Sequence, residues 1–143
     1  MKVTQKSKLA LVSLVQMTKN SEKQVRVQDL ANDQKCSTHF LEQIFRNLRI
    51  AKIVKSVRGP GGGYKLARPA TEVSVKDVMV ALKENLSDWG GDFSDTAEAS
   101  QVSEYLISVE NNIRKEFESQ TLAKMAGVSD NVIQFPAQTV RAA

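Results

Sequence analysis

A glycine-rich segment in the middle of the chain constrains the fold more than any other feature. Residues 56–69, with the sequence SVRGPGGGYKLARP, contain four of the seven glycines and two of the three prolines in the protein. Glycine and proline interrupt helices. The runs on either side of the loop, KIVKSV and YKLARP, alternate polar and apolar residues as strands do. The sequence therefore predicts a β-hairpin with RGPGGG as its loop.

The same glycines could also form a loop that binds nucleotide phosphates. Such a loop needs a helix directly after it and, in nucleotide hydrolases, a Gly-Lys-Ser/Thr ending. The strand-like sequence YKLA follows here instead. A glycine loop has few side chains to hold it away from a surface, so Arg58 at its shoulder can reach a phosphate or enter a DNA minor groove.

Helical periodicity covers most of the remaining chain. Residues 6–19 are apolar on more than one side, which predicts a helix buried over most of its surface. A very short strand and a second helix at about 28–33 are expected next. A third helix at 38–51, capped by Ser37, has apolar residues at every third or fourth position. Helix, turn, helix and hairpin is the order of a winged helix-turn-helix, although the helix pair alone fits any packed helical hairpin.

The second half of the chain predicts two further helices and a short one, TLAKMAG. A capping box formed by Ser74 and Asp77 opens a helix that should end near Leu86. A long amphipathic helix follows at about 100–119, with too little surface in its own chain to cover its apolar stripe. A second copy, giving a homodimer, is the economical way to bury that stripe. The residues expected at the dimer interface are Val102, Leu106, Val109, Ile113 and Phe117.

Charge is distributed unevenly along the chain. Residues 1–72 have a net charge of +9 and residues 73–143 of −5. A basic half suggests contact with a polyanion, and an acidic half suggests a different role, although solvated charges clustered by accident would look the same. We expect a mainly α protein with a small β wing, divided into a DNA-binding head at 1–72, a linker helix, acidic loop and dimerisation helix at 73–126, and a flexible tail at 127–143.

Composition excludes several other classes. No apolar run approaches the roughly 20 residues that a membrane span needs, and the N-terminus lacks a signal-peptide cleavage pattern. The single cysteine cannot form an internal disulfide, which fits a reducing bacterial cytoplasm. One cysteine, one histidine and no paired-carboxylate motif provide no nucleophile and base for catalysis. We therefore expect a cytoplasmic protein that is not an enzyme and does not bind membranes.

The segment STHFLEQIFRNLRIAKIVKSVRGPGGGYKLARP resembles the signature region of a family of bacterial winged-helix transcription regulators. This family includes the iron–sulfur regulator IscR, the nitric-oxide sensor NsrR and the cysteine-metabolism repressor CymR. The resemblance covers about residues 1–126 and is strongest at 1–80. It implies a homodimeric regulator, here expected to be a repressor, that binds double-stranded DNA at a pseudo-palindromic operator. The recognition helix would enter the major groove and the wing the adjacent minor groove.

The resemblance also implies which residues contact DNA. Glu42 matches a glutamate that can accept a hydrogen bond from a cytosine amino group, and Arg58 matches the wing arginine that enters the minor groove. The complete set comprises Thr4, Lys6 and Lys8 near the N-terminus, Ser37, Thr38, His39, Phe40, Glu42, Gln43 and Arg46 on the recognition helix, and Arg58, Gly59, Gly61 and Gly62 in the wing.

The chain departs from the iron–sulfur members of the family, which carry three cysteines in the loop before the long helix. Residues 87–100 contain no cysteine, and their Asp and Glu oxygens suit iron–sulfur clusters poorly. We therefore expect no cofactor and no metal. A cluster held by unusual ligands is the alternative, and replacement of cysteines at Ala97 and Ala99 would give the same sequence. The signal could be a small-molecule effector at this loop, oxidation of Cys36 or a protein partner.

Some residues allow two interpretations. Cys36 is either a small hydrophobic residue in the helix-turn-helix turn or a redox-sensitive thiol beside Lys35. Trp89 and Phe93 either pack in the fold or line an effector pocket. Lys35 and Lys52 replace glycines common in the family, which predicts a mildly strained backbone at Lys35. The alternative function is a protein-interaction adaptor that lost DNA binding, but such a protein would be free to lose the wing arginine.

Overall fold

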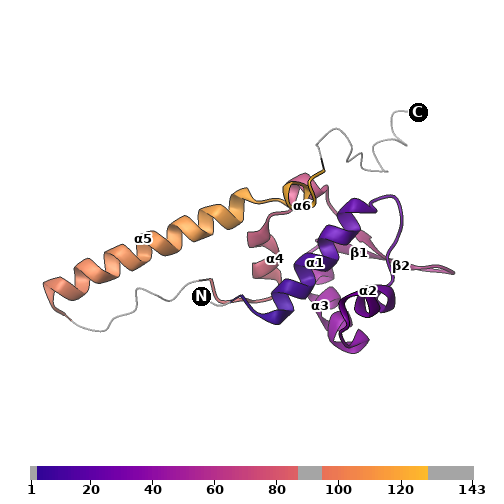
Figure 1. Ribbon diagram of the computed structural model, residues 1–143, viewed down its shortest axis with the longest axis horizontal. Coiled ribbons are helices and arrows are strands. Elements are labelled where there is room, and N and C mark those ends of the chain that lie inside the picture. Colours follow the sequence, from indigo (N-terminus) through magenta and orange to yellow (C-terminus); the bar gives the residue numbers. More distant parts are fainter. Residues whose placement is uncertain (1–2, 87–94, 129–143) are drawn as a thin grey trace.

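The computed structural model describes residues 3–86 and 95–128, and the expected mainly helical fold with a small β wing is confirmed. Figure 1 shows a compact group of helices with a two-stranded wing on one side and one long helix projecting from the other. The helices of the group are α1 (Gln5–Lys19), α2 (Val27–Gln34), α3 (Thr38–Ile50), α4 (Val75–Ala81) and α6 (Leu122–Ala126). The other elements are β1 (Val54–Val57), β2 (Gly63–Leu66), the 3₁₀ helix η1 (Ala70–Glu72) and the projecting helix α5 (Ala97–Ser119).

A single hydrophobic core holds these elements together. The apolar face of α3 is buried and contacts α1, α2, β1 and α4. Helices α4 and α6 follow the expected head in sequence but contribute to the same core. The largest fully buried side chains are Phe45, Leu14, Leu41, Ile44, Leu48, Ile53, Met79, Leu82 and Leu122. Because both halves of the chain supply core residues, residues 3–72 and the helices α4 and α6 are packed into one body.

The wing is a β-hairpin that is also tied to the chain between α1 and α2. Strands β1 and β2 pair antiparallel, from Val54 opposite Leu66 to Val57 opposite Gly63. Val25 and Tyr64 exchange two backbone hydrogen bonds of 2.9 and 2.8 Å. The very short strand expected before α2 is therefore a single bridge, because Val27 already belongs to α2.

Four helices end with the same backbone turn. The residue after the last turn is left-handed in each, with φ between 53° and 67°, at Lys35, Lys52, Lys83 and Gly127. The next amide donates to the carbonyl five residues back, with distances of 2.9–3.1 Å, which is the Schellman arrangement. Lys35 keeps the left-handed backbone that glycine would adopt there, although the turn was expected to adjust to the lysine. Three of these positions hold lysine although glycine would be free of the steric cost.

Two helix boundaries differ from the sequence prediction. Helix α4 ends at Ala81 rather than near Leu86, because the chain turns at Lys83 and Lys6 donates to the Leu82 carbonyl oxygen at 2.7 Å. Helix α5 begins at Ala97 rather than near residue 100, because Thr96 caps its first turn by accepting from the Ala99 amide. Both differences come from short polar contacts that do not appear in the apolar periodicity.

Helix α1 is less enclosed than its sequence predicts. Leu9, Leu14 and Met17 are buried, but Val12 is 47% exposed. Within the described ranges, no helix combines the length and the apolar character needed to cross a membrane. Trp89, Phe93 and residues 129–143 of the expected tail lie outside the described residues.

Replacing Lys35 by glycine should stabilise the protein. Lysine at φ 53° and ψ 45° carries a steric cost that glycine avoids, while glycine makes the unfolded chain more flexible. The balance is a gain of about 0.5 kcal/mol in the free energy of unfolding. Urea denaturation followed by circular dichroism measures it.

Lys8→Gly is the matched control, because Lys8 is exposed and lies inside α1. That change should lower the free energy of unfolding by about 1 kcal/mol. A loss of stability in Lys35→Gly of similar size would show that the left-handed turn carries no strain.

Candidate nucleic-acid interface

The exposed face of α3 carries four of the residues predicted to contact DNA. His39, Glu42, Gln43 and Arg46 recur every three or four positions, so they share one side of the helix, and all four are exposed. The opposite side is buried in the core. His39 and Gln43 are within hydrogen-bonding distance at 3.2 Å. The face thus presents an acid, an amide, an imidazole and a guanidinium on a rigid support.

The beginning of α3 is fixed by the turn of the helix-turn-helix. The Ser37 hydroxyl accepts a hydrogen bond of 3.3 Å from the Phe40 amide and caps the helix. Cys36 is half-buried and packs against the core. Thr38 is half-buried and Phe40 is 37% exposed at the start of the same helix. Ser37 therefore has a structural role besides any contact with DNA.

The wing loop depends on its glycines at specific positions. Gly59 and Gly61 have φ of 102° and 71°, which side-chain-bearing residues rarely adopt. A Cβ on Gly62 would lie 2.4 Å from the Val57 carbonyl oxygen. The Gly61 carbonyl also accepts a hydrogen bond of 2.7 Å from the Gln24 side chain. The loop is thus a tight turn held from both sides, with Arg58 exposed at its shoulder.

The two wing strands place positive charges opposite each other. Lys55 on β1 faces Lys65 on β2 directly across the hairpin. Like charges at directly opposed positions destabilise a hairpin in isolation. A polyanion beside the wing would be attracted by both lysines.

An aromatic contact links the wing to the recognition helix. The rings of Phe45 on α3 and Tyr64 on β2 have centroids 5.0 Å apart at an angle of 51°. Phe45 is fully buried, and Tyr64 also bonds to Val25. These contacts hold α3 and the wing at a defined separation, as two elements that read neighbouring grooves require.

The residues predicted for phosphate contact near the N-terminus are partly used inside the protein. The hydroxyls of Thr4 and Ser7 both donate to the Glu84 carboxylate. The Lys6 ammonium lies 3.9 Å from the same carboxylate. Lys8 is exposed and makes no such contact within the described residues. Of the three predicted residues, Lys8 has the freest charge.

Glu84 is the residue around which this N-terminal cluster forms. Only 7% of its side chain is exposed. Burial raises the pKa of Glu84, but the hydrogen bonds from Ser7 and Thr4 and the charge of Lys6 outweigh burial, and the net pKa is lowered. The carboxylate therefore stays ionised and ties the end of α4 to the beginning of α1.

The stripe predicted for dimerisation lies along a helix with few neighbours. Helix α5 has 23 residues, a length of about 35 Å, and Figure 1 shows it projecting from the rest of the fold. Its base packs on α4, with an ion pair between Lys76 and Glu118. Val102 is 49% exposed. The other predicted residues, Leu106, Val109, Ile113 and Phe117, are half-buried.

Three residues with a clear role at this site were not identified from the sequence. Gln24 and Tyr64 anchor the wing, and Glu84 organises the N-terminal cluster. The YKL alternation marks Tyr64 as a strand residue but does not reveal its ring partner. No sequence signal connects Glu84 with residues 77 or more positions earlier.

The chain is similar to known transcriptional regulators over most of its length. The profile of the Rrf2 family, described as iron-dependent transcriptional regulators, matches residues 3–127. The HTH-type transcriptional regulator IscR of Cereibacter sphaeroides is 41% identical over 90 residues, covering 61% of this chain and 58% of that relative. A Mycobacterium tuberculosis protein that carries the name HTH-type transcriptional regulator is 35% identical over 132 residues, covering 89% of this chain and 82% of its own.

Two solved structures of transcriptional regulators resemble the fold over most of the chain. The global cysteine regulator CymR of B. subtilis superimposes with a TM-score of 0.79 at 27% identity, covering 91% of this chain and 99% of CymR. IscR of T. potens superimposes with a TM-score of 0.73 at 28% identity, covering 97% of this chain and 96% of IscR. The winged-helix fold is therefore shared with both regulators.

The family is described as iron-dependent, but the residues present do not fit an iron–sulfur cluster. Thiolates are the main ligands of such clusters, and the sequence contains one cysteine and one histidine, both in the helix-turn-helix. Among residues 3–86 and 95–128, no three His, Cys, Asp or Glu side chains are placed to hold a metal ion.

The charge of Glu84 should make stability depend on pH. Because its pKa is lowered in the folded state, ionised Glu84 contributes stability fully above its usual value of 4.5, and this contribution is lost as pH falls through the lowered pKa. Glu84→Gln should lower the free energy of unfolding by about 1 kcal/mol at neutral pH. The difference from the unchanged protein should vanish in stronger acid, as measured by urea denaturation at several pH values.

Glu22→Gln provides the control, because Glu22 is exposed. It should change stability little over the same range. A Glu84→Gln effect that stayed constant from neutral to acidic pH would contradict the assigned charge interaction.

Proposed function

This chain belongs to the Rrf2 family of transcriptional regulators, and from that membership we propose that it is a homodimeric regulator that reads a pseudo-palindromic operator. The observation that carries the proposal is the exposed polar face of α3, fixed beside an arginine-bearing wing by the contact between Phe45 and Tyr64. Recognition helices in helix-turn-helix proteins present such a face to the major groove.

The residues divide into those that would read bases and those that would bind the backbone. Glu42 can accept a hydrogen bond from a cytosine amino group, and Arg46 can donate to guanine. Arg58 can enter the minor groove, where a narrow groove strengthens its attraction. Lys8 and Lys65 would contact phosphates, which sets position without reading sequence.

Dimerisation through α5 would place two heads on the two halves of the operator. The predicted stripe is apolar, and a second copy packed along α5 would bury the part that remains exposed, of which Val102 at 49% is the clearest. Two heads related by a two-fold axis would match half-sites about one helical turn apart. We therefore assign residues 1–72 to the DNA-binding head and 73–126 to the linker helix, acidic loop and dimerisation helix, of which the projecting α5 is the arm.

The signal is proposed to act without a conventional iron–sulfur cluster, since the chain lacks the required cysteines. We propose a repressor that acts in the bacterial cytoplasm, has a small molecule or a protein as partner and has no catalytic activity. This agrees with the single cysteine and single histidine of the chain and with the regulators to which the chain is similar. An adaptor that lost DNA binding is the second candidate, and the exposed Arg58 argues against it.

Arg58→Ala separates these two candidates. Under the regulator proposal, removing one arginine from the minor groove should weaken operator binding by about 10- to 100-fold. Selection from random DNA with the unchanged protein provides the operator, and fluorescence anisotropy measures the affinity at several salt concentrations. The salt slope should also fall by about one unit.

Lys115→Ala is the matched control, because Lys115 is an exposed cation on α5, away from the wing. It should leave operator affinity unchanged. Failure of the unchanged protein to enrich any DNA sequence would contradict the proposal and favour the adaptor.

Val102→Glu should disrupt the dimer. Val102 belongs to the predicted stripe and is 49% exposed, so a charge there is tolerated in one chain but not at an apolar interface. The dimer dissociation constant should rise at least about tenfold, because one buried charge costs more than 1.4 kcal/mol. Sedimentation equilibrium measures the constant.

Ile107→Glu is the control on the same helix. Ile107 is 43% exposed but lies away from the predicted stripe. It should leave the dimer intact. A monomeric unchanged protein, or equal weakening by both substitutions, would contradict the proposed interface.

A further inference from the structure

We propose that an open cleft between the recognition helix and the base of the arm binds a small carboxylic acid with a branched apolar tail. The cleft has a volume of about 710 Å³, which lies within the range of small-molecule sites. It continues from the exposed face of α3, since Ile50 lies four residues after Arg46, but its lining includes none of the residues predicted to contact DNA or to form the dimer stripe. Its regulatory consequence rests on the proposed function, but ligand binding itself does not.

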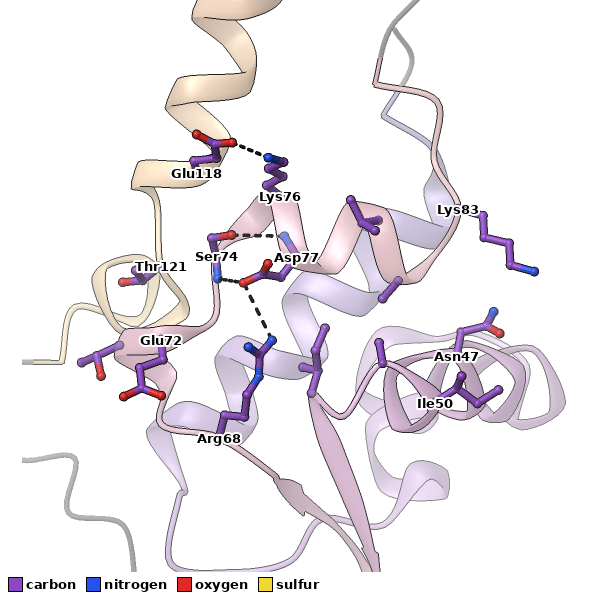
Figure 2. Close-up of a pocket in the computed structure, with 15 residues that line it drawn as sticks. Asn47, Ile50, Arg68, Glu72, Ser74, Lys76, Asp77, Lys83, Glu118 and Thr121 are labelled. Carbon is purple, nitrogen blue, oxygen red and sulfur yellow. Dashed lines mark hydrogen bonds and ion pairs between the residues drawn. The ribbon is translucent and has the colours of Figure 1, made fainter.

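Figure 2 shows that the cleft is built from several elements of the fold. Asn47 and Ile50 come from the end of α3, and Lys83 lies beyond the end of α4. Arg68 reaches from the base of the wing toward Ser74 and Asp77 at the beginning of α4. Glu118 and Thr121, at the base of the arm, complete the lining.

Arg68 is the group best suited to bind a carboxylate. Among residues 3–86 and 95–128, its charged partner is Asp77, at 3.8 Å, which is too long for a hydrogen bond. Its Nε–H is buried and donates to no group within the described residues. The side chain is 38% exposed, so a rotation of its last bonds can bring the guanidinium into the cleft. A carboxylate would then receive two parallel hydrogen bonds.

Asp77 faces Arg68 with an oxygen that already has a hydrogen-bond partner. One of its oxygens accepts a hydrogen bond of 2.9 Å from the Ser74 amide as part of the capping box of α4. The neighbouring Lys76 is paired with Glu118. Among the described cations that line the cleft, Arg68 is the one whose planar donors match the two oxygens of a carboxylate.

The apolar part of the lining favours a branched hydrocarbon tail. Ile50 is 68% exposed and Val80 is 59% exposed, both on the cleft. Ala51 and Ala81 lie beside them and leave room. A short branched tail would cover these side chains and remove their apolar surface from water.

Glu72 can show whether the ligand is an amino acid or a simple carboxylic acid. Glu72 is exposed on the cleft and has no ion pair or hydrogen bond from its side chain within the described residues. Its carboxylate can bind the ammonium group of an amino acid, whereas a simple carboxylic acid offers no such group. A carboxylate with a branched tail is thus the shared chemistry, and Glu72 reports whether an amino group accompanies it.

Ligand binding would connect the head with the arm. The cleft touches α3 through Asn47 and Ile50, and it touches the base of α5 through Glu118. A ligand that binds better in one arrangement of α3 and α5 shifts the protein toward that arrangement. Under the proposed function, DNA affinity would change in response.

The test uses three probes that share a branched tail: 4-methylpentanoate, L-leucine and 3-methylbutylamine. The full-length protein is titrated with each at millimolar concentrations, and the Arg68 Nε–H signal is followed by nitrogen-15 NMR. We expect both carboxylates, but not the amine, to shift that signal. No response to either carboxylate, or an equal response to the amine, would overturn the proposal.

Arg68→Gln should weaken carboxylate binding, measured by calorimetry, by at least about tenfold. Ile50→Ser should weaken it too, and because Ile50 is exposed this change does not threaten folding. Arg26→Gln is the matched control, since Arg26 is an exposed arginine paired with Asp29 outside the cleft. Unchanged affinity in both Arg68→Gln and Ile50→Ser would overturn the proposal.

Two further comparisons identify the source and separate the proposals. Tighter binding of L-leucine than of 4-methylpentanoate, abolished by Glu72→Gln, would support an amino acid, and equal binding would support a simple carboxylic acid. Carboxylate binding without selective DNA binding would support the cleft and contradict the proposed function. Selective DNA binding without any carboxylate binding would overturn the cleft alone.

Discussion

The burial of one face of α3 is the constraint on which the rest of this structure depends. Leu41, Ile44, Phe45 and Leu48 are all at most 1% exposed, and they contact helices from both halves of the chain and the first wing strand. Burying such side chains contributes about 1.5–3 kcal/mol each. Because every third or fourth residue of α3 faces inward, the remaining positions must face solvent. The polar face that bears Glu42 is therefore a direct consequence of the core.

Short connections then determine where the helices point. Left-handed turns at Lys35, Lys52 and Lys83 reverse the chain within two residues and satisfy the last carbonyls of each helix. Lysine has a higher conformational energy than glycine in a left-handed backbone. The turns are retained because the helices packed on both sides fix the path of the chain. The same backbone turn lies between α2 and α3, between α3 and the wing, and directly after α4.

Several residues predicted to contact DNA also make contacts that stabilise the fold. Ser37 caps α3, and Lys6 and Thr4 bind the Glu84 cluster at the end of α4. A hydroxyl or ammonium in such a contact must lose it before binding a phosphate through the same donor. Exposed groups such as Lys8 and Arg58 carry no such cost. Position on a motif therefore indicates a family role, whereas the existing partners determine how freely the side chain can perform it.

The sequence by itself determined the helices, the hairpin and the family. Periodicity located the buried face of α3, the glycines located the wing, and the prediction of a winged-helix regulator family is confirmed. These features are local, because a helix or turn is specified by neighbouring residues. Only the tertiary structure decided the end of α4, the Glu84 cluster, the ring contact of Tyr64 and the cleft around Arg68. Each joins side chains far apart in the chain, and their distance is set by how the core packs, which no local pattern records.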